Sequence, residues 1–142
     1  MAAPLKTYDP GQVSVIIGGK IMSGFAESSL IKVSRNQDAY SLKIGTDGEG
    51  VRTRMRDKSG KIEIMLMQSS DSNDILSAYA LVDEANNSGL IPFLLRDASG
   101  RTLVSAKTAW VKKIADVEMG KEIKDHTWVL ETDQLDMFVG GN

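Results

Sequence analysis

The amino-acid sequence predicts a mainly β protein: a β-sandwich or barrel with one flanking α-helix, at about residues 74–87, and a long hairpin excursion early in the chain. The chain holds about eight to ten short runs rich in β-branched and aromatic residues, separated by turn-forming residues. One segment shows the periodicity of an amphipathic helix. With 142 residues, 42% of them hydrophobic, the chain fits a single domain, residues 1–142, with residues 1–11 as an N-terminal arm.

Short strands are expected directly after the arm. Residues 13–17 and 20–25 are apolar runs on either side of Gly18-Gly19, and a glycine pair in this position is typical of a two-residue hairpin turn. Two further strands are expected at residues 30–34 and 40–44, joined by a polar turn.

A long, charged excursion follows these strands. The glycine-rich segment 45–50 leads into the alternating segment 51–56. One face of the alternating segment carries three arginines, Arg52, Arg54 and Arg56. We expect residues 40–68 to form a three-strand meander that contains this excursion.

The strand expected at residues 61–68 has two different faces. One face carries the aliphatic residues Ile62, Ile64 and Leu66, which suit a core. The opposite face carries Glu63, Met65 and Met67. Because this second face is too apolar for open water, it indicates a surface that a partner covers.

The predicted helix begins after this strand. Residues 69–73 are of the types that cap helix N-termini. Ile75, Tyr79 and Val82 form a narrow apolar stripe, which Leu76 and Ala78 are expected to widen. Gly89 is the expected C′ residue that ends the helix.

The second half of the chain predicts more strands, at residues 90–96, 101–106, 109–114 and 126–132, the last of them continued by 135–139. Trp110 is the expected core anchor, and Trp128 and Leu130 are expected to share one face of the strand at 126–132. The acidic segment 115–125 is expected to be a loop that crosses one end of the barrel.

Two turns of this sequence resemble each other. Residues 56–61 (RDKSGK) and 96–101 (RDASGR) share an Asp and a Gly in the same places. We expect both turns to hold their glycine, Gly60 and Gly100, at a positive φ.

No motif for catalysis, metal binding or cofactor binding stands out. The chain has no cysteine and a single histidine, His126, without a nucleophile motif around it. The segment 45–50 lacks the ligand pattern of a calcium loop and the spacing of a phosphate loop. We expect no enzyme activity, no catalytic residue, no metal and no cofactor. Residues 1–6 show no signal peptide, and no uncharged run is long enough to span a bilayer.

The distribution of charge suggests two functions. The net charge is −2, but the three arginines of segment 51–56 contrast with an acidic last quarter. Opposite charge on two surfaces of one chain favours head-to-tail association, which closes into rings or continues as filaments. The alternative is a nucleic-acid-binding small β-barrel that uses the Arg52, Arg54 and Arg56 stripe, although few aromatic residues lie near it.

The chain resembles the tail tube (inner tube) proteins of contractile-tailed bacteriophages over nearly its whole length. The residues that carry the resemblance are, in order, 6–10 (KTYDP), 13–19 (VSVIIGG), 34–36 (SRN), 66–68 (LMQ), 72–76 (SNDIL), 99–103 (SGRTL), 109–110 (AW) and 137–142 (MFVGGN). None of these pieces is a catalytic signature, and their order along the chain makes the match specific.

This resemblance implies a structural protein of the virion tail, made in the host cytoplasm and related in fold to type VI secretion tube proteins. Its copies are expected to stack as hexameric rings into the conduit for phage DNA during ejection. The implied partners are further copies of itself, the tail sheath, the tail terminator and the baseplate or initiator proteins. The tape measure protein and DNA are expected to pass through the bore without sequence-specific binding. No membrane insertion is expected.

The resemblance also implies where subunits meet. In such proteins a long loop between early strands reaches a neighbouring subunit or ring, and residues 45–60 occupy that place here. The candidate interface residues are Thr46, Asp47, Glu49, Arg52, Arg54, Arg56, Lys58, Met65 and Met67. Because the bore of such tubes is usually negative, Glu63 is the candidate for a residue that faces it.

Overall fold

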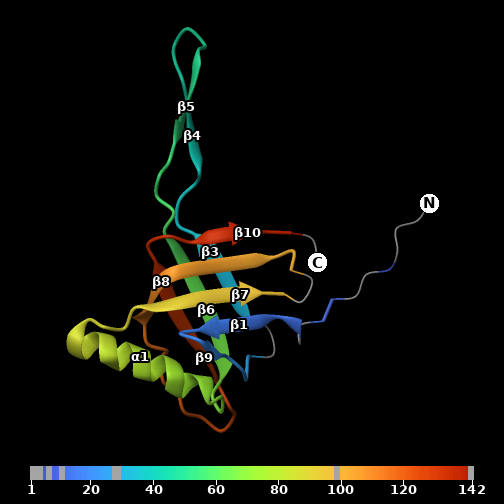
Figure 1. Cartoon of the computed structure of the whole chain (residues 1–142), viewed down its shortest axis with the longest axis vertical. Helices are drawn as coiled ribbons and strands as arrows, with labels where there is room; N and C mark the ends of the chain where they lie inside the picture. The colour runs from blue at the N-terminus through green and yellow to red at the C-terminus, as the bar shows by residue number, and fades with distance from the viewer. Residues whose placement is uncertain (1–4, 6–7, 10–11, 27–29, 98–99, 141–142) are drawn as a thin grey trace.

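A computed structural model of the chain describes residues 5, 8–9, 12–26, 30–97 and 100–140. Most of the predicted arm, residues 1–4, 6–7 and 10–11, lies outside this part. The elements of the described part are β1 (Ser14–Ile17), β2 (Lys20–Ile21), β3 (Ile31–Arg35), β4 (Tyr40–Ile44), β5 (Gly50–Arg54), β6 (Gly60–Met67), α1 (Ser72–Asn86), β7 (Ile91–Arg96), β8 (Leu103–Lys113), β9 (Asp125–Thr132) and β10 (Asp136–Phe138). The predicted mainly β class with one helix is confirmed (Figure 1).

One antiparallel sheet builds the body of the molecule, in the order β2-β1-β7-β8-β9-β6-β3, with β10 added beside β8. β8 belongs to two layers. Around Val104 it pairs with β7 and β10, and from Ala109 onward it pairs with β9. The sheet bends along this strand, so the layer with β1, β7 and β10 crosses steeply over the layer with β9, β6 and β3 (Figure 1).

The chain after β2 closes one end of this bent sheet. Ala26 N donates to Met65 O at 2.9 Å, and Met67 N donates to Gly24 O at 2.8 Å. The segment therefore joins the β1 edge of the sheet to β6 on the other layer. The predicted hairpin at Gly18-Gly19 is confirmed, since both residues have positive φ, 61° and 81°, as a two-residue turn of this type requires.

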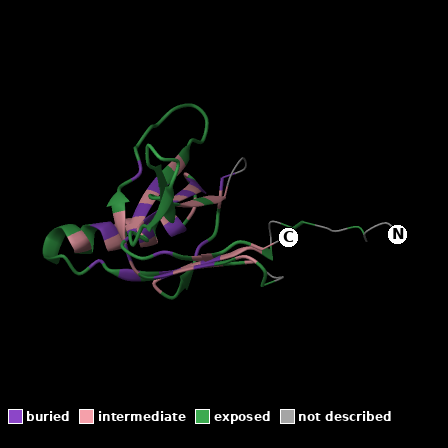
Figure 2. Ribbon diagram, turned by 90° about the horizontal axis from the view of Figure 1, so that it is seen from above, coloured by how far each residue is buried: buried purple, intermediate pink, exposed green. Residues whose placement is uncertain are grey.

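The core lies between the two layers, and its strands alternate between buried and half-buried residues (Figure 2). Ile62, Ile64 and Leu66 are fully buried, as the alternation of residues 61–68 predicted. Trp128 and Leu130, predicted to share a face, are both buried, but Trp110 is only half-buried, so the prediction of Trp110 as the core anchor was wrong. Its neighbour Ala109 points into the core instead, because successive residues of a strand face opposite ways.

Helix α1 packs Leu76 and Ala80 into the core, with Ile75 and Tyr79 partly buried beside them. Val82 is 44% exposed, so its predicted place on the apolar stripe was wrong. No helix of the described residues is long and apolar enough to cross a membrane.

The helix ends at Asn86, close to the predicted end, but a different residue terminates it. Asn87 adopts the left-handed conformation at φ 59° and ends α1 in place of the predicted Gly89. Gly89 has a different reason to lack a side chain. A Cβ there would lie 2.7 Å from the Tyr79 carbonyl oxygen, closer than side chains tolerate.

Three predicted features of strand pairing were wrong. β5 pairs only with β4 among the described strands, so residues 40–68 form no meander; β6 pairs with β3 and β9 instead. The two strands predicted at 101–106 and 109–114 are one strand, β8, whose register shifts at bulges. The segment predicted to continue β9 turns back, and its strand β10 pairs with β8.

The two similar turns also differ. Gly100 has a positive φ of 72°, as predicted, whereas Gly60 does not and begins β6. Gly60 is needed for space, because a Cβ at this buried position would collide with the side chain of Leu135.

Candidate subunit interface

Strands β4 and β5 form a separate two-stranded sheet that stands away from the body of the molecule (Figure 1). Their register runs from Tyr40 opposite Arg54 to Ile44 opposite Gly50. Every residue of both strands is exposed. A lone two-stranded hairpin is marginally stable in water, so this hairpin is the part of the described chain that most needs a partner. From here on, we call residues 39–56 the arm; it is distinct from the N-terminal arm expected at residues 1–11.

One face of the arm combines apolar and basic side chains. Residues that pair across an antiparallel ladder share a face, which groups Tyr40, Leu42 and Ile44 with Arg52 and Arg54. The Arg52 guanidinium lies 4.1 Å from the centre of the Tyr40 ring, a cation–π contact. The structure thus brings two of the three predicted arginines together with three exposed apolar residues that the sequence analysis did not single out.

The tip of the arm carries Thr46, Asp47 and Glu49, all exposed. Asp47 Oδ1 accepts a hydrogen bond from Glu49 N at 3.1 Å, and Gly48 adopts a φ of 87°. This short turn reverses the chain at the tip, and the rest of the arm, residues 39–44 and 50–56, is its stem.

The base of the arm is fastened to the body by hydrogen bonds. Leu135 N donates to Lys58 O at 2.8 Å, and the Arg35 guanidinium donates to Leu135 O at 2.8 and 3.2 Å. Ser59 N donates to Asp57 Oδ1 at 2.8 Å, and hydrogen bonds from Ser59 hold the pKa of the Asp57 carboxyl below its usual value. The predicted residue Lys58 therefore acts through its backbone here, while its side chain is exposed.

Glu63, Met65 and Met67 lie on β6, on the outer face of the body. They form a group separate from the arm. Lys61 Nζ lies 2.9 Å from Glu63 Oε1, and this lysine holds the pKa of Glu63 below its usual value by hydrogen bonding and by charge. Met65 is half-buried and Met67 is exposed.

The chain between β8 and β9, residues 114–124, is a loop, as predicted for the acidic segment 115–125, and most of its residues are exposed. Val117, Met119 and Ile123 are apolar and exposed on it. Apolar residues in a strand-rich chain usually indicate burial, so the sequence carried no signal for their exposure.

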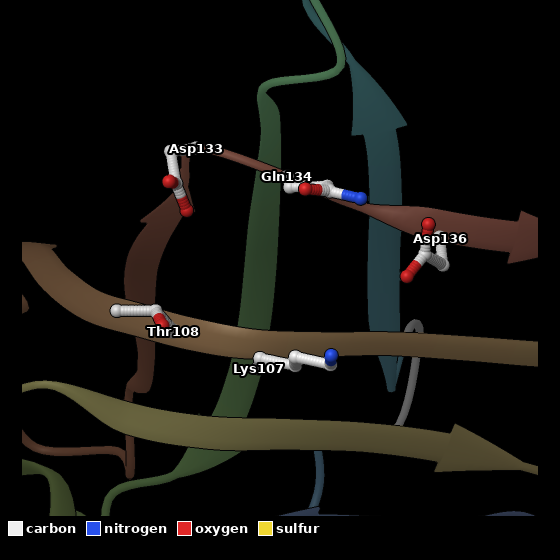
Figure 3. A pocket seen from close by; sticks show the side chains of 5 residues that line it. All are labelled: Lys107, Thr108, Asp133, Gln134 and Asp136. Atoms are coloured by element: carbon white, nitrogen blue, oxygen red, sulfur yellow. The ribbon is translucent and has the colours of Figure 1, made fainter.

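Two hollows on the surface are small and polar. One, of about 190 Å³, is lined by Lys107, Thr108, Asp133, Gln134 and Asp136 (Figure 3). The other, of about 230 Å³, lies where the 114–124 loop meets β9. Both volumes are below the range usual for small-molecule sites, so neither supports a substrate pocket. Among the described residues, no cluster of histidine and carboxylate side chains fits a metal ion.

Comparison with known proteins gives a family and a fold. A family model described as bacteriophage PhiTE tail tube protein matches residues 11–140. "Structural protein ORF10" of Pseudomonas phage KPP10 is 27% identical over 150 aligned residues, which cover 100% of this chain and 87% of that protein.

Solved structures of low sequence identity share the fold. The tube-terminating cap of the anti-feeding prophage superposes with a TM-score of 0.58 at 10% identity, over 99% of this chain and 96% of the cap. A chain of the sheath–tube complex of PVC, an extracellular contractile injection system, gives a TM-score of 0.56 at 11% identity, over 94% of this chain and 92% of that one.

Proposed function

The chain belongs to the bacteriophage PhiTE tail tube protein family, and on this premise we propose that its copies assemble into stacked hexameric rings that form the inner tube of a contractile tail. A tail tube protein is a structural component of the virion tail. The tube would conduct phage DNA during ejection, inside a contractile sheath, and its subunits would be made in the host cytoplasm. We propose no enzymatic activity and no cofactor.

The observation that carries this proposal is the isolated arm. A hairpin whose strands are exposed along their whole length, and whose stem joins apolar and basic side chains, suits contact with another subunit. A neighbour that covers the arm would bury Leu42 and Ile44 and pair the guanidinium groups. The residues we assign to this contact are Thr46, Asp47, Glu49, Arg52, Arg54, Arg56 and Lys58.

The outer face of β6 is a second proposed contact. Met65 and Met67 would be covered by a subunit of the same ring, which supplies the apolar cover that this face lacks in the monomer. Glu63 is proposed to face the bore, where carboxylates repel the phosphates of passing DNA. Its pairing with Lys61 would moderate that repulsion.

The solved relatives support partners beyond the tube itself. One of them comes from a sheath–tube complex and another from a tube-terminating cap. By analogy we propose the tail sheath, a terminator and baseplate or initiator proteins as partners, with the tape measure protein and DNA inside the bore. The DNA contact would be independent of sequence.

A nucleic-acid-binding role for the arginine stripe is the weaker candidate. Such a role needs aromatic faces that are free to stack on bases. Tyr40, the aromatic residue beside the stripe, is covered on one face by Arg52 at 4.1 Å.

Negative-stain electron microscopy of the purified protein, with its mass in solution by light scattering, tests the proposal. Hollow tubes or rings with a central bore are the expected result. If the protein stays monomeric even with purified tail baseplates as nuclei, the tube assignment for this chain is wrong. Salt-sensitive retention of DNA on a filter would then favour the weaker candidate.

A further inference from the structure

The arm and the 114–124 loop are complementary in chemistry, and we call residues 114–124 the acceptor loop. On the acceptor loop, Val117 is 75% exposed and Met119 is 72% exposed. On the arm, Leu42 is 71% exposed. Side chains of this size and exposure on both surfaces would each lose unfavourable contact with water if the two surfaces met.

The charges on the two surfaces are opposite. The arm stem carries Lys43, Arg52, Arg54 and Arg56. The acceptor loop carries Asp116, Glu118 and Glu122, and Asp125 follows it directly. Lys121 and Lys124 offset part of this charge, and Lys113, directly before the loop, lies 3.7 Å from Asp116 Oδ1, so residues 113–125 keep a small net negative charge. Charge complementarity of this kind steers association and fixes the register of a contact.

The acceptor loop is held in shape by the body of the molecule. Gln68, directly after β6, accepts a hydrogen bond at Oε1 from Lys124 N at 3.1 Å, and its own N donates to Lys124 O at 3.1 Å. Its Nε2 lies 3.3 Å from Met119 Sδ, at the middle of the loop. Gln68 therefore holds the loop at its middle and at its C-terminal end.

The arm and the acceptor loop lie at opposite ends of one strand. β6 begins at Gly60, beside the base of the arm, and ends at Met67, directly before Gln68, which holds the acceptor loop. Figure 1 shows the arm at the top of the molecule and the chain between β8 and β9 at the bottom. A chain therefore cannot place its arm on its own acceptor loop, and the partner must be another molecule.

We infer that the acceptor loop is the docking surface for the arm of a second copy of this chain in the adjacent ring. This inference rests on the proposed tube function and names the surfaces through which its rings stack. Each copy gives one arm and receives one, which is a heterologous contact that does not close on itself. The arginines of the stem face the carboxylates of the loop, and Leu42 and Ile44 pack against Val117 and Met119.

Charge reversal on each surface tests the inference. One variant carries Arg52→Glu, Arg54→Glu and Arg56→Glu, and another carries Asp116→Lys, Glu118→Lys and Glu122→Lys. Each alone is expected to abolish tube growth in the electron microscope while the circular dichroism spectrum stays that of the wild type. The variant that combines all six changes is expected to form tubes again. A control variant with Asp74→Lys and Glu84→Lys, on α1, is expected to assemble normally.

A second measurement tests the same contact if the charge-reversed variants do not fold. Since the chain has no cysteine, the pair Leu42→Cys and Val117→Cys introduces the only thiols. Oxidised tubes of this variant are expected to give a ladder of disulfide-linked chains on a non-reducing gel, and each single variant is expected to give no ladder beyond dimers.

The outcomes separate this inference from the proposed function. Wild-type protein that forms no ring or tube overturns the function. Wild-type tubes together with normal growth of both charge-reversed variants, or with a double-cysteine variant that polymerises without a ladder, overturn the inference and leave the function standing.

Discussion

Gly60 and Leu135 meet where the arm joins the body, and their contact is an example of packing that allows no side chain. A Cβ on Gly60 would collide with Leu135 and lie 3.1 Å from Ser34 O. We expect Gly60→Ala to destabilise the fold by about 1–3 kcal/mol, the usual cost of overpacking, as measured by urea unfolding. Gly120→Ala is the control. Its Cβ would meet only Lys124 Cε, at 3.6 Å, so equal losses from both variants would contradict this account.

The Lys61–Glu63 pair makes a small contribution to stability that depends on pH. Because Lys61 lowers the pKa of Glu63 below its usual value of 4.5, the contribution is present above that pH and is lost as the pH falls through the lowered pKa. For a surface pair it amounts to about 0–1 kcal/mol.

We expect Lys61→Met to raise the pKa of Glu63 toward its usual value, as followed by NMR titration of the side-chain carboxyl carbon. Lys112→Met breaks the separate pair between Lys112 and Glu131, which is 2.9 Å long, and serves as the control. An unchanged Glu63 pKa in the Lys61 variant would show that other groups cause the shift.

We expect the body of the molecule to fold without the arm. Its strands pair with no other strand of the described chain. We expect replacement of residues 41–53 by a short glycine–serine turn to change the free energy of unfolding by no more than about 0.5 kcal/mol. The same variant is expected to form no tubes in the electron microscope. A large loss of stability would mean that the arm belongs to the folding unit.

For strands, the alternation of apolar residues in the sequence predicted which side chains face the core better than it predicted which strands pair. The core face of β6 and the buried Trp128 followed from the alternation of apolar residues. The partner of β5 did not, because a strand pattern states which side chains share a face and nothing about which strand lies beside it. The length of β8 was also missed, since its bulges shift the alternation within one continuous strand.

The candidate site was predicted only in part. The charged excursion appeared at the right residues, because glycines and alternating arginines mark an exposed hairpin. The apolar half of the contact was missed on both surfaces. Leu42, Ile44, Val117 and Met119 are residue types that sequence reasoning assigns to a core, and only the three-dimensional structure reveals their exposure.

For the whole molecule, we expect the opposite charge at its two ends to make the proposed assembly sensitive to salt. The screening length falls from about 10 Å at 0.1 M salt to about 3 Å at 1 M. We expect the protein concentration needed for tube growth to rise with added NaCl, as measured by sedimentation. The urea midpoint of the monomer, whose ion pairs lie at the surface, serves as the control and should change little. If the protein concentration needed for tube growth does not change with NaCl, the contact is purely apolar.

The placement of the arm and the acceptor loop at opposite ends of β6 has a consequence for a finished tube. A polymer stacked through this contact has polarity. At one of its ends the arms of the last ring are unbound, and at the other end the acceptor loops of the last ring carry no arm. A protein that caps the first end must imitate the loop, and a protein that starts growth from the second must offer arms. The two proteins at the two ends of the tube thus each reproduce a different surface of this chain, the acceptor loop in one case and the arm in the other.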